Sequence, residues 1–259
     1  MYETTVVEAK TLGSAWEKAC KLILKKGQKR FVQAPEYQIA TLDLPMIIKV
    51  SDPFAKPRLS KLAADSREAV EEYADSLING YPDPEKEKEF EYTYHSRLRC
   101  YPDCKVRAWL PALSANEEEL SAQVRKIVAD GKCVVTRIDQ VEAAIKILKK
   151  DPTRRTVVMH TWIPYRDLMK FGPRREETSS PCLVLAYPQL VEGRLHLFVV
   201  LKTNDLYNAW PGNAFAFTLL QKHLADGVGV KLGTYTHFSV SMHIYKDKWA
   251  EAKKKFKVK

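Results

Sequence analysis

The sequence contains no run of about 18 apolar residues, the minimum length of a membrane-spanning helix. Its N-terminus, MYETTVVEAK, carries glutamates where a secretory signal peptide would need a basic segment followed by an apolar one. Without a long apolar run or a signal-peptide pattern, the sequence indicates neither a membrane-spanning protein nor a secreted one. We therefore expect a cytoplasmic protein with no membrane partner.

Cysteine is scarce and scattered along the chain. There are five, an odd number without regular spacing: Cys20, Cys100, Cys104, Cys133 and Cys182. This pattern favours reduced thiols over a disulfide framework. Cys100 and Cys104 are four residues apart, but no Cys-x-x-Cys pair or histidine-rich partner accompanies them, so no metal site is expected.

Positive charge is in excess, with a formal net charge of +10. Such an excess favours polyanions or phosphate-bearing small molecules as partners, although lysine enrichment also serves solubility. The sequence lacks the aromatic-interleaved basic motifs of RNA-binding domains and the spacing of zinc fingers. A small phosphorylated ligand is therefore favoured over nucleic acid.

Hydrophobic periodicity predicts both helices and strands. The predicted helices span residues 14–27, 66–79, 115–130, 138–150 and 213–225. The predicted strands span residues 41–50, 155–162, 182–191, 194–203 and 234–245, with a hairpin at Glu192-Gly193. The order is mixed without strict βαβ alternation, and no repeat or linker divides the chain. The sequence predicts an α+β fold with one domain over residues 1–259.

Cys182 follows a proline at the start of one of the predicted strands. A single cysteine in such a place is usually a small buried hydrophobic residue. The position alone therefore indicates no chemistry, and its meaning depends on the rest of the chain.

Four blocks of sequence supply that meaning. Segment 202–213, KTNDLYNAWPGN, has a basic residue, a threonine, an aspartate and then a Pro-x-Asn at fixed spacing. The other blocks are Asp139-Gln140 leading into KDPTRR at 150–155, Pro181-Cys182, and SMHIY at 241–245. In this order and spacing the blocks resemble the thymidylate synthase family over residues 92–245, and THFSVSMHIY with the short front half resembles its archaeal branch.

The resemblance implies a single domain with a large mixed β-sheet flanked by helices. It also implies reductive methylation of dUMP to dTMP at C5, with 5,10-methylenetetrahydrofolate or a related methylene-tetrahydropterin as co-substrate and no metal. Two alternatives stay open: a hydroxymethylase acting on dUMP, dCMP or CMP, and a non-catalytic nucleotide- or RNA-binding relative. The presence of Cys182 and Asn213 argues against the second.

The resemblance assigns catalysis to three residues. Cys182 is expected to add as a thiolate to C6 of the pyrimidine. Tyr94 and a glutamate of the helix at 66–79 are expected to manage protons, and the apolar pattern favours Glu72 over Glu71.

Phosphate binding is implied for five residues. Arg154 and Arg155 are guanidinium donors suited to phosphate, and in the family they reach the partner subunit's site, which implies a homodimer. Thr203 is expected to donate its hydroxyl, and Arg30 to make a further contact. Lys202 stands where the family usually has an arginine, so it keeps the charge but loses the bidentate fork.

The remaining assignments concern the sugar, the base and the co-substrate. His243 and Tyr245 are two residues apart on a predicted strand, so they share a face, and the family uses them to hold the sugar hydroxyl. Asn213 is expected to read the uracil N3–H and O4 with its amide. Asp205 is expected to bind the pterin ring.

Two further positions depart from the family pattern. Leu183 stands where a histidine commonly follows the catalytic cysteine. Asn208-Ala209 replaces a usual Leu-Gly just ahead of the proline block, so we expect a reshaped pterin pocket.

Overall fold

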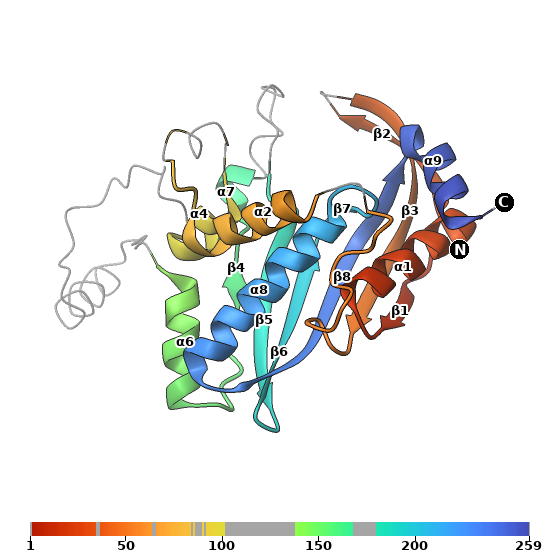
Figure 1. Cartoon of the computed structure of the whole chain (residues 1–259). Coiled ribbons are helices and arrows are strands. Elements are labelled where there is room, and N and C mark those ends of the chain that lie inside the picture. Colours follow the sequence, from red (N-terminus) through yellow and green to blue (C-terminus); the bar gives the residue numbers. More distant parts are fainter. Residues whose placement is uncertain are drawn as a thin grey trace.

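The computed structural model describes residues 2–34, 37–63, 66–83, 85, 90, 92–101, 138–167 and 180–258. One mixed sheet organises this part of the chain (Figure 1), with strand order β1-β3-β8-β6-β5-β4, β2 beside β3 and β7 beside β8. The strands are β1 (Thr5–Ala9), β2 (Gln28–Ala34), β3 (Tyr37–Val50), β4 (Met159–His160), β5 (Leu183–Val191), β6 (Arg194–Leu201), β7 (Asn204–Asp205) and β8 (Lys231–Tyr245). The predicted α+β class with a large mixed sheet is confirmed.

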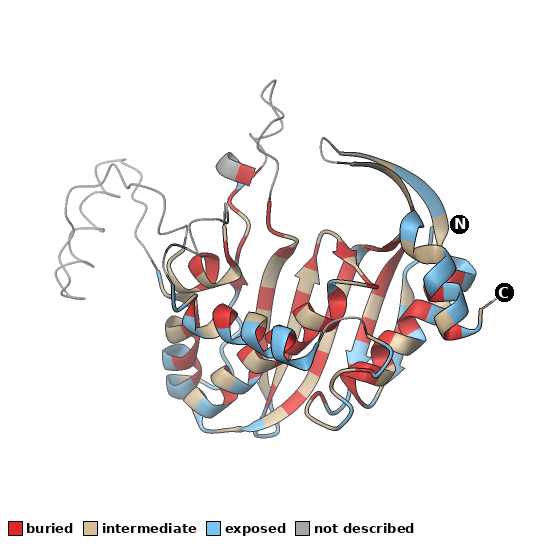
Figure 2. Ribbon diagram, turned by 45° about the horizontal axis from the view of Figure 1, so that its top comes forward, coloured by how far each residue is buried: buried red, intermediate tan, exposed pale blue. Residues whose placement is uncertain are grey.

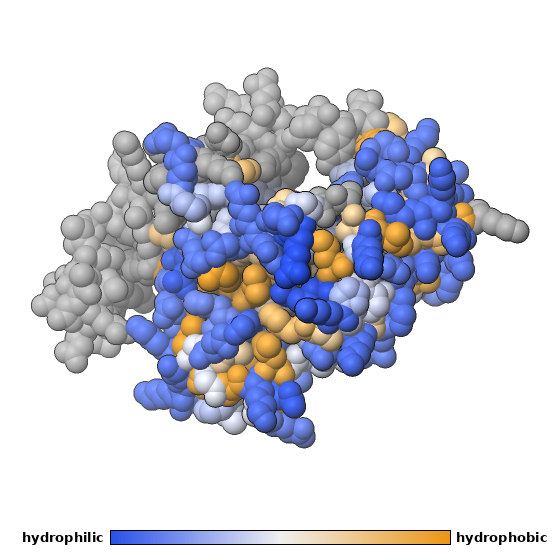
Figure 3. All heavy atoms as spheres, in the orientation of Figure 1, coloured by the Kyte–Doolittle hydropathy of each residue, from blue (hydrophilic) through white to orange (hydrophobic). Residues whose placement is uncertain are grey.

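Helices α1 and α8 cross the face of the sheet that is turned toward the viewer in Figure 1. The helices of the described residues are α1 (Leu12–Lys26), α2 (Arg67–Asn79), α4 (Tyr94–Arg99), α6 (Gln140–Lys150), α7 (Pro164–Asp167), α8 (Trp210–Val228) and α9 (Lys246–Phe256). Buried residues concentrate where these helices meet the strands (Figure 2). On the face seen in Figure 3, hydrophilic side chains surround smaller apolar patches.

Capping side chains set where the helices begin. The Ser66 hydroxyl accepts a hydrogen bond from Ala69 N at 3.2 Å, and α2 ends at Gly80 with φ 80°, as the sequence predicted. Helix α1 begins two residues earlier than predicted because Thr11 forms a capping box with Ser14. At the start of α6, the Asp139 carboxylate caps the helix by accepting hydrogen bonds from the amides of Val141 and Glu142.

Several predicted boundaries shift. The hairpin at Glu192 and Gly193 is confirmed, and both residues have positive φ, as its tight turn requires. The strand predicted at 155–162 is only β4, and the helix predicted at 213–225 extends over all of α8. The helix predicted at 115–130 lies outside the described residues. Strands β1, β2 and β7 and helices α4, α7 and α9 were not predicted.

Strand direction brings distant segments to one edge of the sheet. Strand β5 is antiparallel to β6, so the start of β5 lies beside the end of β6, and Lys202 N donates to Cys182 O at 2.9 Å. Strand β8 is parallel to β6, so it also runs toward this edge. We call the region where β5 begins and β6 and β8 end the catalytic edge.

The cysteines differ in state. Cys20 and Cys182 are free thiols. Cys100 is disulfide-bonded, which corrects the expectation of reduced thiols throughout. The irregular spacing of the cysteines along the sequence could not show which of them become neighbours in the folded chain. None of the helices in the described ranges is long and apolar enough to cross a membrane.

A buried ion pair fixes α4 against α7. The Arg97 guanidinium donates to both carboxylate oxygens of Asp167, at 3.2 and 3.0 Å, and to Thr161 O at 3.1 Å. The two side chains are 1% and 0% exposed. Because Tyr94 lies one turn before Arg97, this pair also holds Tyr94 in place.

We expect Arg97→Ala to lower the free energy of unfolding by about 3–5 kcal/mol, because it leaves the buried Asp167 charge without its partner. Urea denaturation measures this change. Arg99→Ala is the matched control on the same helix, because its pairs with Asp139 and Glu142 are partly solvated. The control should cost no more than about 1 kcal/mol, and equal losses in both variants would contradict the assignment.

Candidate active site

Cys182 lies at the catalytic edge, half-buried, directly before β5. The Lys202 ammonium, from the end of β6, donates to the Ser180 hydroxyl and lies 4.9 Å from the centre of the Trp162 ring. Ser180 and Trp162 therefore hold the cation next to the thiol. Neither Ser180 nor Trp162 was predicted as a site residue from the sequence. Each lies in a segment that comes next to Lys202 only when the chain folds.

Two opposing effects act on the thiol. Burial raises the pKa of Cys182 above its ordinary value, and the Lys202 charge lowers it. Burial also lowers the pKa of Lys202, while the negative charges of Cys182 and Asp167 raise it. The free protein therefore keeps a protonated thiol that Lys202 biases toward the thiolate.

Tyr94 also lies near Cys182. Its hydroxyl oxygen accepts a hydrogen bond from Leu183 N at 3.2 Å, at the peptide that follows the cysteine. Burial first, and then nearby Cys182, Tyr73 and Tyr92, raise the pKa of Tyr94 well above its ordinary value. The phenol is thus neutral and suits a proton relay better than a permanent base.

Asn213 lies in the first turn of α8 and is 9% exposed. Its side-chain carbonyl accepts a hydrogen bond from the Tyr73 hydroxyl of α2 at 2.9 Å. Burial raises the pKa of Tyr73, as do Tyr92, Tyr81 and Cys182 in turn. Tyr73 was not predicted as a site residue, although it lies in the apolar stripe that predicted α2.

The signature segment continues as β7 beside β8. Thr203 Oγ1 lies 3.1 Å from His243 Nδ1, which also lies 3.2 Å from the carbonyl of Ser241. That carbonyl can only accept, which favours the proton on Nδ1 and leaves Nε2 as an acceptor. His243 Nε2 is buried with no hydrogen-bond partner among the described residues, so it is free to accept from a ligand hydroxyl.

Asp205 holds the turn after β7. Its carboxylate accepts from the amides of Tyr207 and Asn208, at 2.9 and 3.2 Å, and from the Asn208 side chain at 2.7 Å. Three hydrogen bonds leave some acceptor capacity on the two oxygens. Asp205 thus has a structural role in addition to its predicted contact with the pterin.

Tyr245 and Arg30 share one row of the sheet. Arg30 is opposite Thr41, and Thr41 is opposite Tyr245, so the two are separated by two strand spacings, about 10 Å. Arg30 pairs with the buried Asp43 at 3.4 Å. Asp43 also accepts hydrogen bonds from the hydroxyls of Tyr2 and Ser241. It was not predicted as a site residue, because in the sequence it alternates with the apolar residues of a strand.

Two predicted phosphate ligands lie apart from this cluster. Arg154 and Arg155 are exposed in the segment after α6, and the Arg155 carbonyl accepts from the Tyr187 hydroxyl of β5 at 3.0 Å. Tyr187 is five residues along from Cys182, a distance of roughly 15 Å. Within one chain, the structure does not bring these arginines to the thiol.

Glu72 is also outside the cluster. It is exposed on α2, as are the other acids of that helix, Glu68, Glu71 and Asp75. Successive residues on a helix point about 100° apart, so the face turned to Asn213 carries Tyr73 instead. The assignment of Glu72 as the catalytic glutamate stays a prediction.

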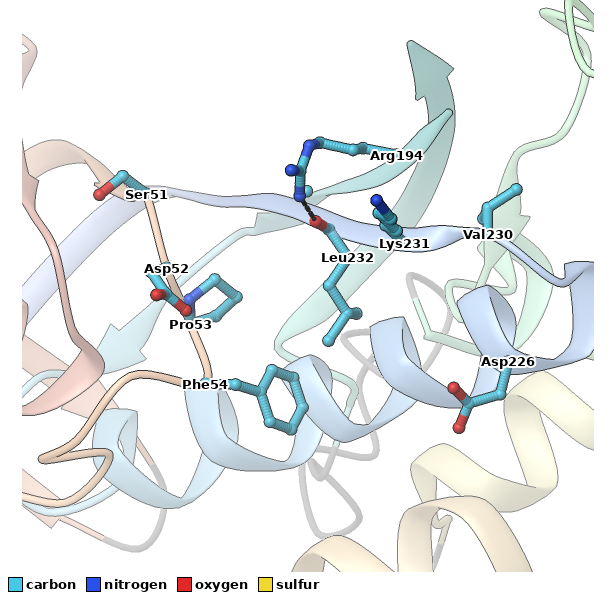
Figure 4. A pocket seen from close by; sticks show the side chains of 10 residues that line it. Ser51, Asp52, Pro53, Phe54, Arg194, Asp226, Val230, Lys231 and Leu232 are labelled. Carbon is cyan, nitrogen blue, oxygen red and sulfur yellow. Dashed lines mark hydrogen bonds between the residues drawn. The ribbon is translucent and has the colours of Figure 1, made fainter. Parts of the chain in front are cut away.

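A hollow of about 350 Å³ opens between α2 and the start of α8. Ala69, Val70, Tyr73, Asn208, Ala209, Gly212 and Asn213 line it. A second hollow, of about 510 Å³, lies where β6 and β8 begin, far from the catalytic edge (Figure 4). Its charges are mixed, with Arg194 and Lys231 near Asp52 and Asp226. No cluster of metal-ligating side chains occurs in the described segments.

Comparison with known proteins identifies the family. The fold and site define an α+β protein built around a half-buried, cation-flanked thiol. A sequence model described as thymidylate synthase matches residues 85–259. Proteins named "Putative thymidylate synthase" are similar: that of Methanosarcina barkeri is 31% identical, covering 94% of this chain and 91% of the relative, and that of Methanocaldococcus jannaschii is 30% identical, covering 96% and 95%.

A bacterial relative matches over a shorter stretch. The thymidylate synthase of Clostridium beijerinckii is 29% identical, covering 44% of this chain and 41% of its own. The chain belongs to the thymidylate synthase family.

We expect Lys202→Met to raise the pKa of Cys182, because the ammonium charge favours the thiolate. The rate of iodoacetamide labelling at pH 8 should fall roughly three- to tenfold, since one pKa unit changes the thiolate fraction about tenfold. Peptide mapping assigns the label to Cys182. Lys222→Met, which removes a solvated lysine paired with Asp226, is the control. An unchanged pH profile in Lys202→Met would contradict the electrostatic role.

Proposed function

We propose that this protein catalyses the reductive C5 methylation of dUMP to dTMP, with Cys182 as the nucleophile. The observation that carries the proposal is the half-buried Cys182 thiol, which is close enough to interact with the Lys202 ammonium and is followed by a peptide that donates to the Tyr94 hydroxyl. Asn213 and His243 belong to the same end of the fold, through α8 and the end of β8. Membership of the thymidylate synthase family supports this choice among thiol chemistries.

The nucleotide would bind along the catalytic edge. Lys202, Thr203 and Arg30 are the donors for its phosphate within one chain. His243 would accept the sugar hydroxyl at Nε2, whose burial without a partner is costly unless a ligand donates to it. Tyr245, whose ring centre lies 4.7 Å from that of His243, would complete the sugar contact.

Covalent chemistry at the base follows from these positions. The Cys182 sulfur bonds to C6, and the electron pair of the C5–C6 double bond moves toward C5 and O4. The Asn213 amide stabilises the charge at O4 by donating a hydrogen bond. C5 would then take the one-carbon unit from the co-substrate, with the pterin amine as the leaving group, while Tyr94 relays the proton that C5 loses. Delivery of a hydride to the one-carbon unit and cleavage of the bond between sulfur and C6 would restore the double bond and the thiolate.

The co-substrate would occupy the hollow beside Asn213. Its lining combines apolar walls with the amides of Asn208 and Asn213, which fits a flat ring with polar edges. Asp205, whose carboxylate keeps acceptor capacity, would hold the ring's donors. When bound, a methylene-tetrahydropterin supplies the one-carbon unit and the hydride.

We further propose a homodimer in which Arg154 and Arg155 complete the partner's phosphate site. Both arginines are exposed, and the Arg155 carbonyl accepts a hydrogen bond from Tyr187, whose backbone lies roughly 15 Å along β5 from Cys182. The sheet face opposite α8 carries half-buried apolar side chains, among them Phe198, Val200 and Phe238. A second copy on this face would cover them and bring the arginines across.

We expect Cys182→Ser to abolish tritium release from dUMP labelled at C5, because a serine alkoxide is far scarcer than a thiolate at neutral pH. The fold should persist, as circular dichroism would show. In the wild type, 5-fluoro-dUMP should form an adduct on Cys182 in the presence of a methylene-tetrahydropterin. An adduct on another cysteine, or none with any donor, would refute the mechanism. A hydroxymethylated product mass would identify the related hydroxymethylase instead.

We expect inactive Cys182→Ser and inactive Arg155→Ala proteins to regain activity when mixed. Heterodimers assemble one site with both an intact thiol and an intact arginine, up to about a quarter of wild-type activity when exchange is complete. Native mass spectrometry checks subunit exchange. No recovery after confirmed exchange would place Arg155 in its own subunit's site or outside the sites.

A further inference from the structure

Tyr73 contacts the residue that is expected to read the base. Its hydroxyl lies 2.9 Å from Asn213 Oδ1, the one hydrogen bond shown between these side chains of α2 and α8. Gly212 has no side chain, and a Cβ there would lie 3.7 Å from the Tyr73 ring, so the ring packs closely on the start of α8. The contact therefore belongs to a packed helix pair.

The phenol favours one orientation of the amide. Burial raises the pKa of Tyr73, so the hydroxyl keeps its proton at neutral pH and needs an acceptor. The Asn213 carbonyl provides one, whereas the flipped amide would present its NH₂ group and leave the phenol proton unpaired.

The orientation decides which base fits. With its carbonyl held by Tyr73, Asn213 can still accept from the N3–H of uracil through the second lone pair and donate from Nδ2 to O4. Cytosine has an acceptor at N3 and a donor at its 4-amino group, so it requires the flipped amide. An amide without Tyr73 could turn to suit either base.

We infer that Tyr73 is a specificity-determining positioning residue, whose hydroxyl fixes the Asn213 amide in the orientation that reads uracil and disfavours the one that reads cytosine. The inference rests on the proposed function, since it concerns the base in that same site. Helix α2, from which a catalytic glutamate was expected, would thus also contribute the residue that orients Asn213.

The test compares kcat/KM for dUMP and dCMP in the wild type, Tyr73→Phe, Asn213→Ala and the double variant. The wild type should prefer dUMP, and Tyr73→Phe should reduce that preference roughly tenfold, the effect of one unpaired buried polar group. In the Asn213→Ala background, which has no amide to orient, Tyr73→Phe should leave the ratio unchanged. Tyr207→Phe, which removes a hydroxyl that donates to Glu251 at 2.7 Å, is the matched control and should keep the wild-type ratio.

Three outcomes overturn the inference: a wild type that prefers dCMP, a ratio unchanged in Tyr73→Phe, or the same change in both backgrounds. Thermal unfolding midpoints confirm that each variant is folded. Calorimetric binding of dUMP and dCMP to the same proteins separates this inference from the proposed reaction. A wild type that binds dUMP preferentially without methylating it refutes the reaction, and the binding ratios then decide the role of Tyr73. A wild type that binds neither nucleotide refutes both.

Discussion

The directions of three neighbouring strands determine where the chemistry can occur. Strand β6 is parallel to β8 and antiparallel to β5, so two strands end where the third begins. The hydrogen bond from Lys202 N to Cys182 O fixes this arrangement at the thiol. After β6 the chain turns into β7, which pairs with the last part of β8 and brings Thr203 to His243. A side chain at this edge is therefore positioned by backbone hydrogen bonds rather than by a loose loop.

Electrostatics at the thiol depends on that placement. Burial favours the neutral form of Cys182, and the nearby ammonium of Lys202 opposes it. A lysine offers a compact charge rather than a bidentate fork, so Ser180 and the Trp162 ring supply the orientation that a guanidinium would have by itself. The tyrosines near the thiol are neutral, and they add hydrogen-bonding groups without adding charge.

The helices place further side chains at this edge. The buried Arg97–Asp167 pair fixes the helix that carries Tyr94, and the packing of α2 on α8 brings Tyr73 to Asn213. The acids of α2 are exposed, and the contact of this helix with Asn213 comes from the Tyr73 phenol. Arg154 and Arg155 lie in the exposed segment after α6, where the Arg155 carbonyl contacts Tyr187 of β5, and this placement is the structural reason for proposing a homodimer.

The sequence by itself determined the class of fold, the hairpin at Glu192-Gly193, the position of α2, and the four blocks that resemble the thymidylate synthase family. These are local signals, carried by neighbouring residues or by fixed spacing along the chain. Only the tertiary structure decided that Tyr73 rather than Glu72 faces Asn213, since a one-residue difference in helical phase is resolved by packing against α8. It also decided that Asp43, Ser180 and Trp162 support the site, because their partners are distant in sequence and meet only where the strands of the sheet bring them together.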